Sequence, residues 1–244
     1  MYGVADRWRS LSRRRPATLL NSLLDIFLPT VCVLCRQPGK IVCQACLDDL
    51  PRVATPFCHA CGRPTRQARA HCPACRREPL PLQQVRAPLL YEQSVPRLIQ
   101  QFKYHHKRTL AEPLGQLMIN VLPDLSHDID LIIPLPLHPQ RQRQRGYNQA
   151  ELLATEVAGA LDRPVVLTAL RRSRATLPQA KLSAAARQTN IADAFVADPE
   201  LVSDQQVLLI DDVCTTGATL ASAAQALFAA GAHTVSGLCA ARAP

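Results

Sequence analysis

The sequence predicts an α/β protein in which a mainly parallel sheet carries helices on both faces and follows a small cysteine-rich module. Two observations carry this fold class. From residue 85 onward, short runs rich in β-branched residues and leucine alternate with helical stretches, as in parallel sheets. Eight of the ten cysteines lie between Cys32 and Cys75. A chain of 244 residues can hold one sizeable core and a smaller module, and we divide it into residues 1–29, 30–80 and 85–244.

Residues 1–29 are expected to form an amphipathic helix segment, with the helix at residues 17–28. Leucine and phenylalanine recur there at three- and four-residue spacing, and Pro29 ends the pattern. The apolar stripe is expected to pack against the cysteine-rich module or the following domain, with a membrane-surface role as the alternative. The segment is too short and too interrupted to cross a bilayer, and it lacks a cleavage site for export, so we expect a cytoplasmic protein.

Residues 30–80 contain four C-x-x-C pairs: Cys32/Cys35, Cys43/Cys46, Cys58/Cys61 and Cys72/Cys75. Each pair can place two thiolates on one tetrahedral ion, so the eight cysteines predict two Cys₄ structural Zn²⁺ sites. A disulfide framework is the alternative, and it needs an export signal that residues 1–29 do not provide. Sequential pairing joins the first two pairs and the last two, while a crossed arrangement stays open from the sequence alone. His59 and His71 adjoin the ligands and could replace one of them, but with eight cysteines present they are interpreted as neighbours of the sites or as exposed groups.

The formal net charge of +9 is concentrated in residues 1–90, because residues 91–244 carry equal numbers of basic and acidic side chains. A basic zinc module suits contact with phosphate backbones, and a solvated arginine-rich face without such a partner is the alternative. Aromatic residues make up only 4% of the chain, so sequence-specific readout of bases is not predicted.

The elements of the second domain follow from its apolar periodicity. We expect strands at residues 85–91, 129–134, 165–170, 207–210 and 234–238. We expect helices at residues 96–104, 110–121, 149–161 and 218–230. In a parallel sheet, binding sites lie at the carboxyl ends of the strands, so the acids that follow residue 210 are expected to lie at such a site.

The segment at residues 207–219 is an apolar strand that ends in Asp211 and Asp212 and runs through a turn into a helix. Hydroxyl donors and a small residue follow the acids: Thr215, Thr216, Gly217 and Thr219. Carboxylates accept hydrogen bonds from ribose hydroxyls, while free N–H groups at the turn and the helix start attract a phosphate. Gly217 would let a ligand approach the backbone closely. The alternative is that the two acids only cap the helix.

This segment resembles the phosphoribosyl-diphosphate (PRPP) binding motif of the type I phosphoribosyltransferases. That motif is an apolar strand, two acids, two variable residues and then Thr-Thr-Gly, and the sequence matches every position of it. The resemblance implies a site for PRPP and leaves the acceptor of the ribosyl group open.

Arginines recur between the strand at 129–134 and the helix at 149–161. Arg141, Arg143 and Arg145 alternate with glutamines, and Gly146 and Asn148 follow. Arginine makes bidentate contacts with phosphates, so this segment is interpreted as an anion-binding loop, with a plain basic surface loop as the alternative. Gly146 and Asn148 could shape the turn and cap the next helix.

A long polar connection at residues 171–194 is expected to act as a lid, because connections of this length inside a compact domain are commonly functional. Its residues Thr176, Gln179, Leu182, Arg187 and Asn190 stand at a distinctive spacing. Together with Arg-Gly-Tyr-Asn-Gln at 145–149, Phe-Lys-Tyr at 102–104 and the cysteine pairs, this spacing resembles the ComF family of bacteria.

That resemblance implies a double zinc ribbon followed by a phosphoribosyltransferase-type domain, and a link to natural transformation and the use of incoming single-stranded DNA. By the logic of type I enzymes, Asp211 and Asp212 would hold ribose hydroxyls and organise Mg²⁺. The 5′-phosphate would be held by Thr215, Thr216, Gly217 and Thr219. Diphosphate contacts would come from Arg141, Arg145 and Gly146. Lys103 is a further candidate for a phosphate contact, with an exposed lysine on a surface helix as the equal alternative. The lid residues Thr176, Gln179, Arg187 and Asn190 would close over the anomeric carbon, with Gln179 and Arg187 next to the chemistry.

Two functional hypotheses follow. In the first, the protein is a Mg²⁺-dependent, PRPP-binding phosphoribosyltransferase with an unidentified acceptor. In the second, the same constellation clamps the backbone of single-stranded DNA without catalysis, and the basic zinc module recruits DNA or a helicase of the DNA-uptake machinery.

Overall fold

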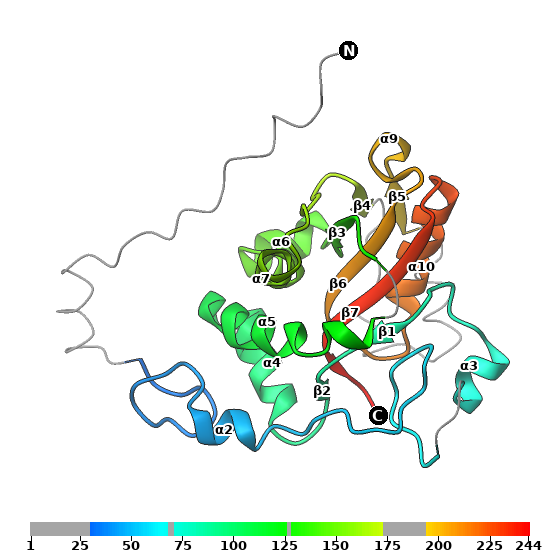
Figure 1. The fold of residues 1–244 in the computed structure, drawn as a ribbon. Helices are drawn as coiled ribbons and strands as arrows, with labels where there is room; N and C mark the ends of the chain where they lie inside the picture. The colour runs from blue at the N-terminus through cyan, green and yellow to red at the C-terminus, as the bar shows by residue number, and fades with distance from the viewer. Residues whose placement is uncertain (1–29, 68–70, 126–127, 173–193) are drawn as a thin grey trace.

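The computed structural model describes residues 30–67, 71–125, 128–172 and 194–244 (Figure 1). The helix expected at residues 17–28 lies outside the described residues. So do the lid residues Thr176, Gln179, Arg187 and Asn190. Their assignments therefore stay predictions.

A five-stranded parallel sheet forms the centre of the described chain, in the order β1-β7-β6-β3, with β2 also pairing with β7. The strands are β1 (Val85–Arg86), β2 (Leu89–Leu90), β3 (Leu131–Pro134), β6 (Gln206–Cys214) and β7 (Thr234–Arg242). The two nine-residue strands, β6 and β7, pair with each other along most of their length. They are buried on both faces, which is why their sequences are almost continuously apolar.

Two hydrophobic cores lie on opposite faces of this sheet. One core holds Leu208 and Ile210 together with side chains of α4 (Val95–Tyr104), α5 (Ala111–Ile119) and α7 (Gln149–Leu161). The other holds Val207 and Leu209 with side chains of α10 (Ala218–Ala229) and of a separate antiparallel pair, β4 (Leu170–Arg172) and β5 (Phe195–Ala197). Alternate residues of β6 thus enter different cores, as the period of a strand requires. The predicted parallel sheet with helices on both faces is confirmed (Figure 1).

Shorter elements complete the fold. They are α2 (Gln44–Asp48), α3 (Pro73–Arg77), η2 (Arg108–Leu110), η3 (Leu122–Asp124), α6 (Pro139–Arg145) and α9 (Pro199–Val202). Helices α2 and α3 each follow the third cysteine of a four-cysteine group. Figure 1 shows α2 beside α4 and α5, and α3 on the opposite side of the molecule, beyond β1.

Several expected elements differ from those of the structure. The strand expected at 165–170 is absent from the sheet: Val165 makes a single parallel bridge to Ile132, and the chain then forms β4 against β5. The strand expected at 85–91 splits into β1 and β2, with Pro88 between them, which has no N–H to donate. Strand β6 continues beyond residue 210, because β7 also continues and supplies partners as far as Cys214.

Candidate functional site

Asp211 and Asp212 lie on β6 just beyond the point where its neighbour β3 ends. The last paired residue of β3 is Pro134, opposite Ile210, so both acids stand at the carboxyl edge of that strand pair. The backbone N–H of Asp212 donates to Oδ1 of Asp211 at 2.8 Å. Asp212 is buried, at 7% exposure, and Asp211 is half-buried. Both acids therefore lie inside the strand, and the fold still places them at the expected edge of the sheet.

Lys103 reaches these acids from the last turn of α4. Its Nζ lies 2.7 Å from Oδ1 of Asp212, and the side-chain exposures are 20% for Lys103 and 10% for Asp212. Burial lowers the pKa of Lys103, but the charges of Asp212 and Asp211 more than reverse this, so its pKa lies above the usual value. Lys103 thus pairs with the carboxylates, and the alternative of an exposed lysine on a surface helix is excluded.

The carboxyl group of Asp211 resists ionisation. Burial raises its pKa to about 8, with the charge of Asp212 acting in the same direction and that of Lys103 against it. Two carboxylates with one ammonium group have a net negative charge when both are ionised. A divalent cation at this point would remove the cost of ionising Asp211, which makes the donor set suitable for a hard metal ion.

The turn that joins β6 to α10, residues 214–217, is called the β6–α10 turn here. Thr215 and Thr216 are exposed, and Oγ1 of Thr216 accepts a hydrogen bond from the N–H of Ala218 at 3.3 Å. Gly217 has φ +88°, the left-handed conformation that favours glycine. A Cβ at Gly217 would lie 3.2 Å from both Cδ atoms of Leu80, so Leu80 packs closely against this glycine. The expected approach of a ligand to the backbone at Gly217 stays a prediction.

The arginine segment after β3 is a helix, α6, and not the loop that the sequence suggested. Asn148 Oδ1 caps α7, as predicted, by accepting from the N–H of Ala150 at 3.1 Å. Gly146, at φ +75°, was expected to shape a turn before that helix, and it ends α6, which was not predicted. Arg145 lies over the ring of Tyr104, 5.0 Å from its centroid, and donates to Gln149 Oε1 at 2.9 Å. Because Tyr104 follows Lys103, α6 brings its last arginine to the edge of the carboxylate site.

Arg141 and Arg172 extend the positive charge around the acids. Burial lowers the pKa of Arg141, and Arg145 adds to this effect. Burial also lowers the pKa of Arg172, with Arg141 acting in the same direction and Asp211 opposing it. Arg172 was not among the predicted site residues, because β4 was not expected to return towards the end of β6. Lys103 and Arg172 thus interact with the two carboxylates, while Arg145 lies near Lys103 and Arg141 lies near Arg145 and Arg172.

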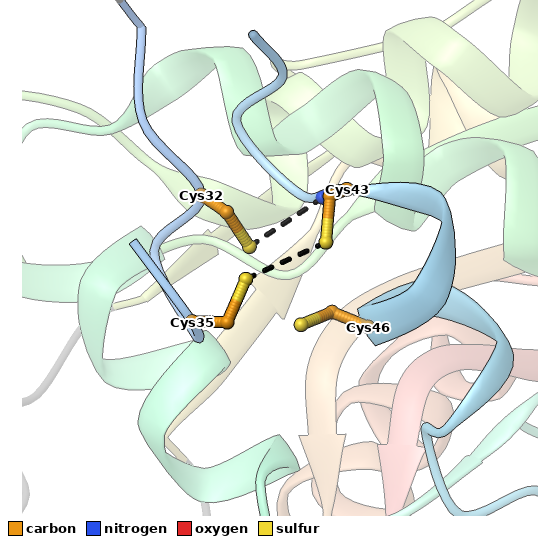
Figure 2. Close-up of side chains that lie close together, drawn as sticks. All are labelled: Cys32, Cys35, Cys43 and Cys46. Atoms are coloured by element: carbon orange, nitrogen blue, oxygen red, sulfur yellow. Dashed lines mark hydrogen bonds between the residues drawn. The ribbon is translucent and has the colours of Figure 1, made fainter. Parts of the chain in front are cut away.

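The eight cysteines form two groups of four, and the grouping is sequential. The first cysteine cluster is Cys32, Cys35, Cys43 and Cys46, and the second cysteine cluster is Cys58, Cys61, Cys72 and Cys75. The ligand atoms of each cluster lie within 4.8 Å of one another. In Figure 2 the four sulfur atoms of the first cluster point towards a common centre. The structure describes all eight as free cysteines, and their grouping into two sequential clusters excludes crossed pairing.

The sulfur geometry fits a tetrahedral metal. With Zn–S bonds of about 2.3 Å, two sulfurs on one zinc ion lie about 3.8 Å apart. The Sγ atoms of Cys35 and Cys43 are 3.5 Å apart, and those of Cys61 and Cys72 are 3.8 Å apart. Backbone N–H groups also point at sulfur, from Cys43 to Cys32 at 3.4 Å and from Cys72 to Cys58 at 3.2 Å. His59 and His71 are exposed and belong to neither cluster, as predicted.

Arg242 is a residue of the site region that the sequence analysis missed. It is 1% exposed and lies at the end of β7, a strand expected to stop at residue 238. Its guanidinium donates to carbonyls of the second cysteine cluster and of the β6–α10 turn. The available signal was a single arginine at the end of the otherwise apolar run of residues 238–242.

Within the described residues, no helix combines the length and the apolar character needed to span a bilayer.

Comparison with known proteins matches residues 23–76 to the double zinc ribbon domain and residues 147–244 to the phosphoribosyl transferase domain. The chain is similar to the DNA utilization protein YhgH of Escherichia coli O157:H7, with 31% identity over 221 residues, covering 87% of this chain and 96% of that protein. It is also similar to competence protein F of Haemophilus influenzae, with 31% identity over 200 residues, covering 78% of this chain and 86% of that protein.

Competence protein ComFC of Bacillus subtilis is 30% identical over 207 residues, covering 80% of this chain and 81% of that protein. Among solved structures, glutamine PRPP amidotransferase from Bacillus subtilis aligns with a TM-score of 0.40 and 18% identity, over 57% of this chain and 30% of that one. The cysteine clusters, the parallel sheet with its β6–α10 turn, and these relatives together show that the chain belongs to the ComF family, in which a double zinc ribbon precedes a phosphoribosyltransferase domain.

Proposed function

We propose that this protein binds PRPP or a related sugar phosphate together with Mg²⁺ at the carboxyl end of β6. The observation that carries the proposal is the pair Asp211 and Asp212, of which Asp212 forms an ion pair with Lys103, at the start of the β6–α10 turn. Such a pair takes ribose hydroxyls, and the start of a twelve-residue helix directly after it offers N–H groups to a 5′-phosphate. Thr215, Thr216, Gly217 and Thr219 would form this phosphate-binding part.

The two carboxylates also suit Mg²⁺, which usually binds proteins through one or two carboxylates plus oxygens of the substrate phosphates. Asp211 and Asp212 would hold it, and when bound it would neutralise part of the charge of a diphosphate. Lys103, Arg141, Arg145 and the turn at Gly146 would contact the same diphosphate from the opposite side. Arg172 joins this group because it lies near Asp211.

As a phosphoribosyltransferase, the protein would transfer the ribosyl group to an acceptor by displacing diphosphate from C1. Negative charge grows on the departing diphosphate, and the cationic side chains stabilise it. The lid residues Thr176, Gln179, Arg187 and Asn190 would exclude water, which would otherwise hydrolyse PRPP. Because the relatives include proteins named for competence and DNA utilization, we place this activity in the cytoplasmic use of incoming DNA.

The test is calorimetric titration of PRPP and Mg²⁺ into zinc-loaded protein. The wild type is expected to bind, and Asp211→Ala/Asp212→Ala is expected to lose binding while keeping a cooperative melting transition. Asp204→Asn is the matched control, because Asp204 is an exposed aspartate just before β6, at the other end of that strand. Absence of binding to the wild type would refute the PRPP site.

A second candidate function, binding of single-stranded DNA, is favoured by the surface beside the acids. Tyr104 is 59% exposed and stacks with Arg145, and Lys107 and Arg108 follow it closely in the chain. An exposed ring flanked by cations is what a base and its phosphate need, even in a chain with few aromatic residues. The basic zinc module would add to this surface and recruit a helicase partner.

Fluorescence anisotropy with a labelled oligonucleotide tests this function. Affinity should fall steeply as salt is raised, and Tyr104→Ala should weaken binding several-fold. Phe228→Ala is the control, because Phe228 is a partly exposed aromatic residue on α10. If both variants bind the oligonucleotide with the affinity of the wild type, Tyr104 does not contribute to DNA binding.

A further inference from the structure

A buried arginine at the end of the last strand joins the second cysteine cluster to the β6–α10 turn. Nε of Arg242 donates to the carbonyl oxygen of Cys61 at 2.8 Å. Its Nη1 donates to the carbonyl oxygen of Cys214 at 2.9 Å and also to that of Thr215. One guanidinium thus contacts the backbone of a predicted zinc ligand and the backbone of the turn proposed to hold the phosphate.

Leu80 makes a second contact between the same two regions. It packs against the second cysteine cluster, and its two Cδ atoms fill the space beside Gly217 where a side chain would otherwise begin. The β6–α10 turn is therefore held at two points: by Arg242 near Thr215 and by Leu80 at Gly217.

The second cysteine cluster is itself fixed to the sheet. The N–H of Val85, the first residue of β1, donates to the carbonyl oxygen of Ala60 at 2.7 Å. A Cβ at Gly62 would lie only 2.6 Å from the carbonyl oxygen of Val85, so the backbones of the cluster and of β1 are in close contact. Nη1 of Arg86 adds a hydrogen bond to the carbonyl oxygen of His59 at 2.8 Å. This cluster can thus serve as a rigid support.

A metal ion in the second cysteine cluster would also stabilise the buried charge of Arg242. Arg242 is almost fully buried, and its three acceptors are neutral carbonyls. Four thiolates around one Zn²⁺ carry a net charge of −2, which would offset the buried guanidinium at short range. Loss of the metal would remove this compensating charge and also release the backbone of Cys61.

The first cysteine cluster has no corresponding contact among the described residues. Nη1 of Arg97, on α4, donates to the carbonyl oxygen of Leu34 at 3.2 Å, and the neighbours of this cluster pack against the core that contains α4 and α5. In Figure 1 the chain of the first cluster lies beside α4, whereas β7 ends next to the segment that carries the second cluster. The two clusters therefore differ in what they support.

We propose that Arg242 is a positioning residue that, with the second cysteine cluster and its Zn²⁺, holds the β6–α10 turn in the shape that receives a phosphate. The first cluster has no part in this. The inference rests on the proposed PRPP site for the identity of the ligand alone, because the coupling between metal, Arg242 and turn can be measured without any ligand.

The experiment compares two buried arginines. Arg242→Gln removes the link to the turn, whereas Arg86→Gln removes a buried guanidinium that bonds to the same cluster without contacting the turn. Hydrogen–deuterium exchange of residues 214–219, zinc content and affinity for PRPP with Mg²⁺ are measured for each. Arg242→Gln should speed exchange at the turn and weaken affinity about tenfold or more, as for a lost hydrogen bond to a charged group. Arg86→Gln should leave the exchange rate at the turn and the affinity for PRPP near those of the wild type.

Four further variants keep the test decisive. Arg242→Lys keeps the charge and should restore part of the protection. Cys75→Ser should speed exchange at the turn, and Cys46→Ser, in the first cluster, should not. If Arg242→Gln fails to fold, Leu80→Ala and Cys75→Ser carry the test. A merely structural role would lower the melting temperature of both arginine variants without separating their exchange at the turn.

The outcomes separate this inference from the proposed function. Unchanged exchange at the turn in Arg242→Gln and Cys75→Ser, or equal changes in Arg86→Gln, would overturn the coupling. Faster exchange in Arg242→Gln and Cys75→Ser, in a protein whose wild type does not bind PRPP, would uphold the coupling and reject the PRPP site.

Discussion

Replacing Lys103 with methionine isolates the electrostatic design of the carboxylate site. Methionine keeps an unbranched side chain of similar length and removes only the charge and its hydrogen bond. Two unit charges 2.7 Å apart attract each other by about 6 kcal/mol at an effective dielectric constant of about 20. Desolvation offsets most of this attraction, yet removal of one partner leaves Asp212 buried with no opposite charge from the described residues in contact.

The expected cost follows from the burial of the pair. Breaking a fully buried pair costs about 3–5 kcal/mol, and the partial exposure of Lys103 and Asp212 reduces this to about 2–3 kcal/mol. In a domain of this size that loss lowers the melting temperature by about 4–12 °C. Millimolar MgCl₂ should stabilise Lys103→Met more than the wild type, because Mg²⁺ no longer competes with the ammonium group for Asp212.

Thermal unfolding followed by circular dichroism, with and without MgCl₂, measures both effects. Lys107→Met is the control, because Lys107 is an exposed lysine just beyond α4 and should change neither value. The reasoning is refuted if Lys103→Met melts with the wild type and Mg²⁺ stabilises the two proteins equally.

Three other predictions address the turn, the raised pKa and the metal. Gly217→Ala should lower the free energy of unfolding by about 1 kcal/mol or more, because of its positive φ and the contact with Leu80, and urea unfolding of this variant beside the wild type measures it. Burial raises the pKa of Asp211 to about 8 in the folded protein, whereas in the unfolded chain its pKa is about 4. Between pH 4 and pH 8 the unfolded chain has therefore lost this proton while the folded protein keeps it, so the stability of the wild type falls as the pH rises from 4 to 8. Asp211→Asn removes this dependence, so its stability relative to the wild type should rise from pH 4 to pH 8 in denaturation series; a constant difference would contradict the assignment. Zinc analysis should give two ions per chain and one for Cys46→Ser, and two ions in the variant would exclude the first cysteine cluster as a site.

Local sequence patterns predicted the elements whose own apolar periodicity marks the face that becomes buried. The helix expected at 149–161 coincides with α7, whose apolar face and Asn148 cap are both encoded locally. The strand at 165–170 failed for the opposite reason. A short apolar run is equally compatible with a strand and with a loop that crosses the end of the sheet. In the structure this run pairs with β3 at a single bridge, between Val165 and Ile132.

For the site, the sequence was sufficient to place Asp211 and Asp212 at a strand end and to group cysteines into pairs. It could not show that Lys103 bonds to Asp212, because these residues are far apart in the chain and meet only when α4 packs across the sheet. Arg172 escaped prediction for a similar reason, since its position depends on the return of β4 against β5.

The sequence by itself determined the family, the four C-x-x-C pairs and the order of the main helices and strands, because each of these depends on the spacing of neighbouring residues. The tertiary structure alone decided which cysteine pairs share a centre, how far β6 extends, and where the charges of Lys103 and Arg242 are directed. These features depend on contacts between residues distant in the chain. Their geometry is fixed by the packing of α4, β7 and the second cysteine cluster around β6.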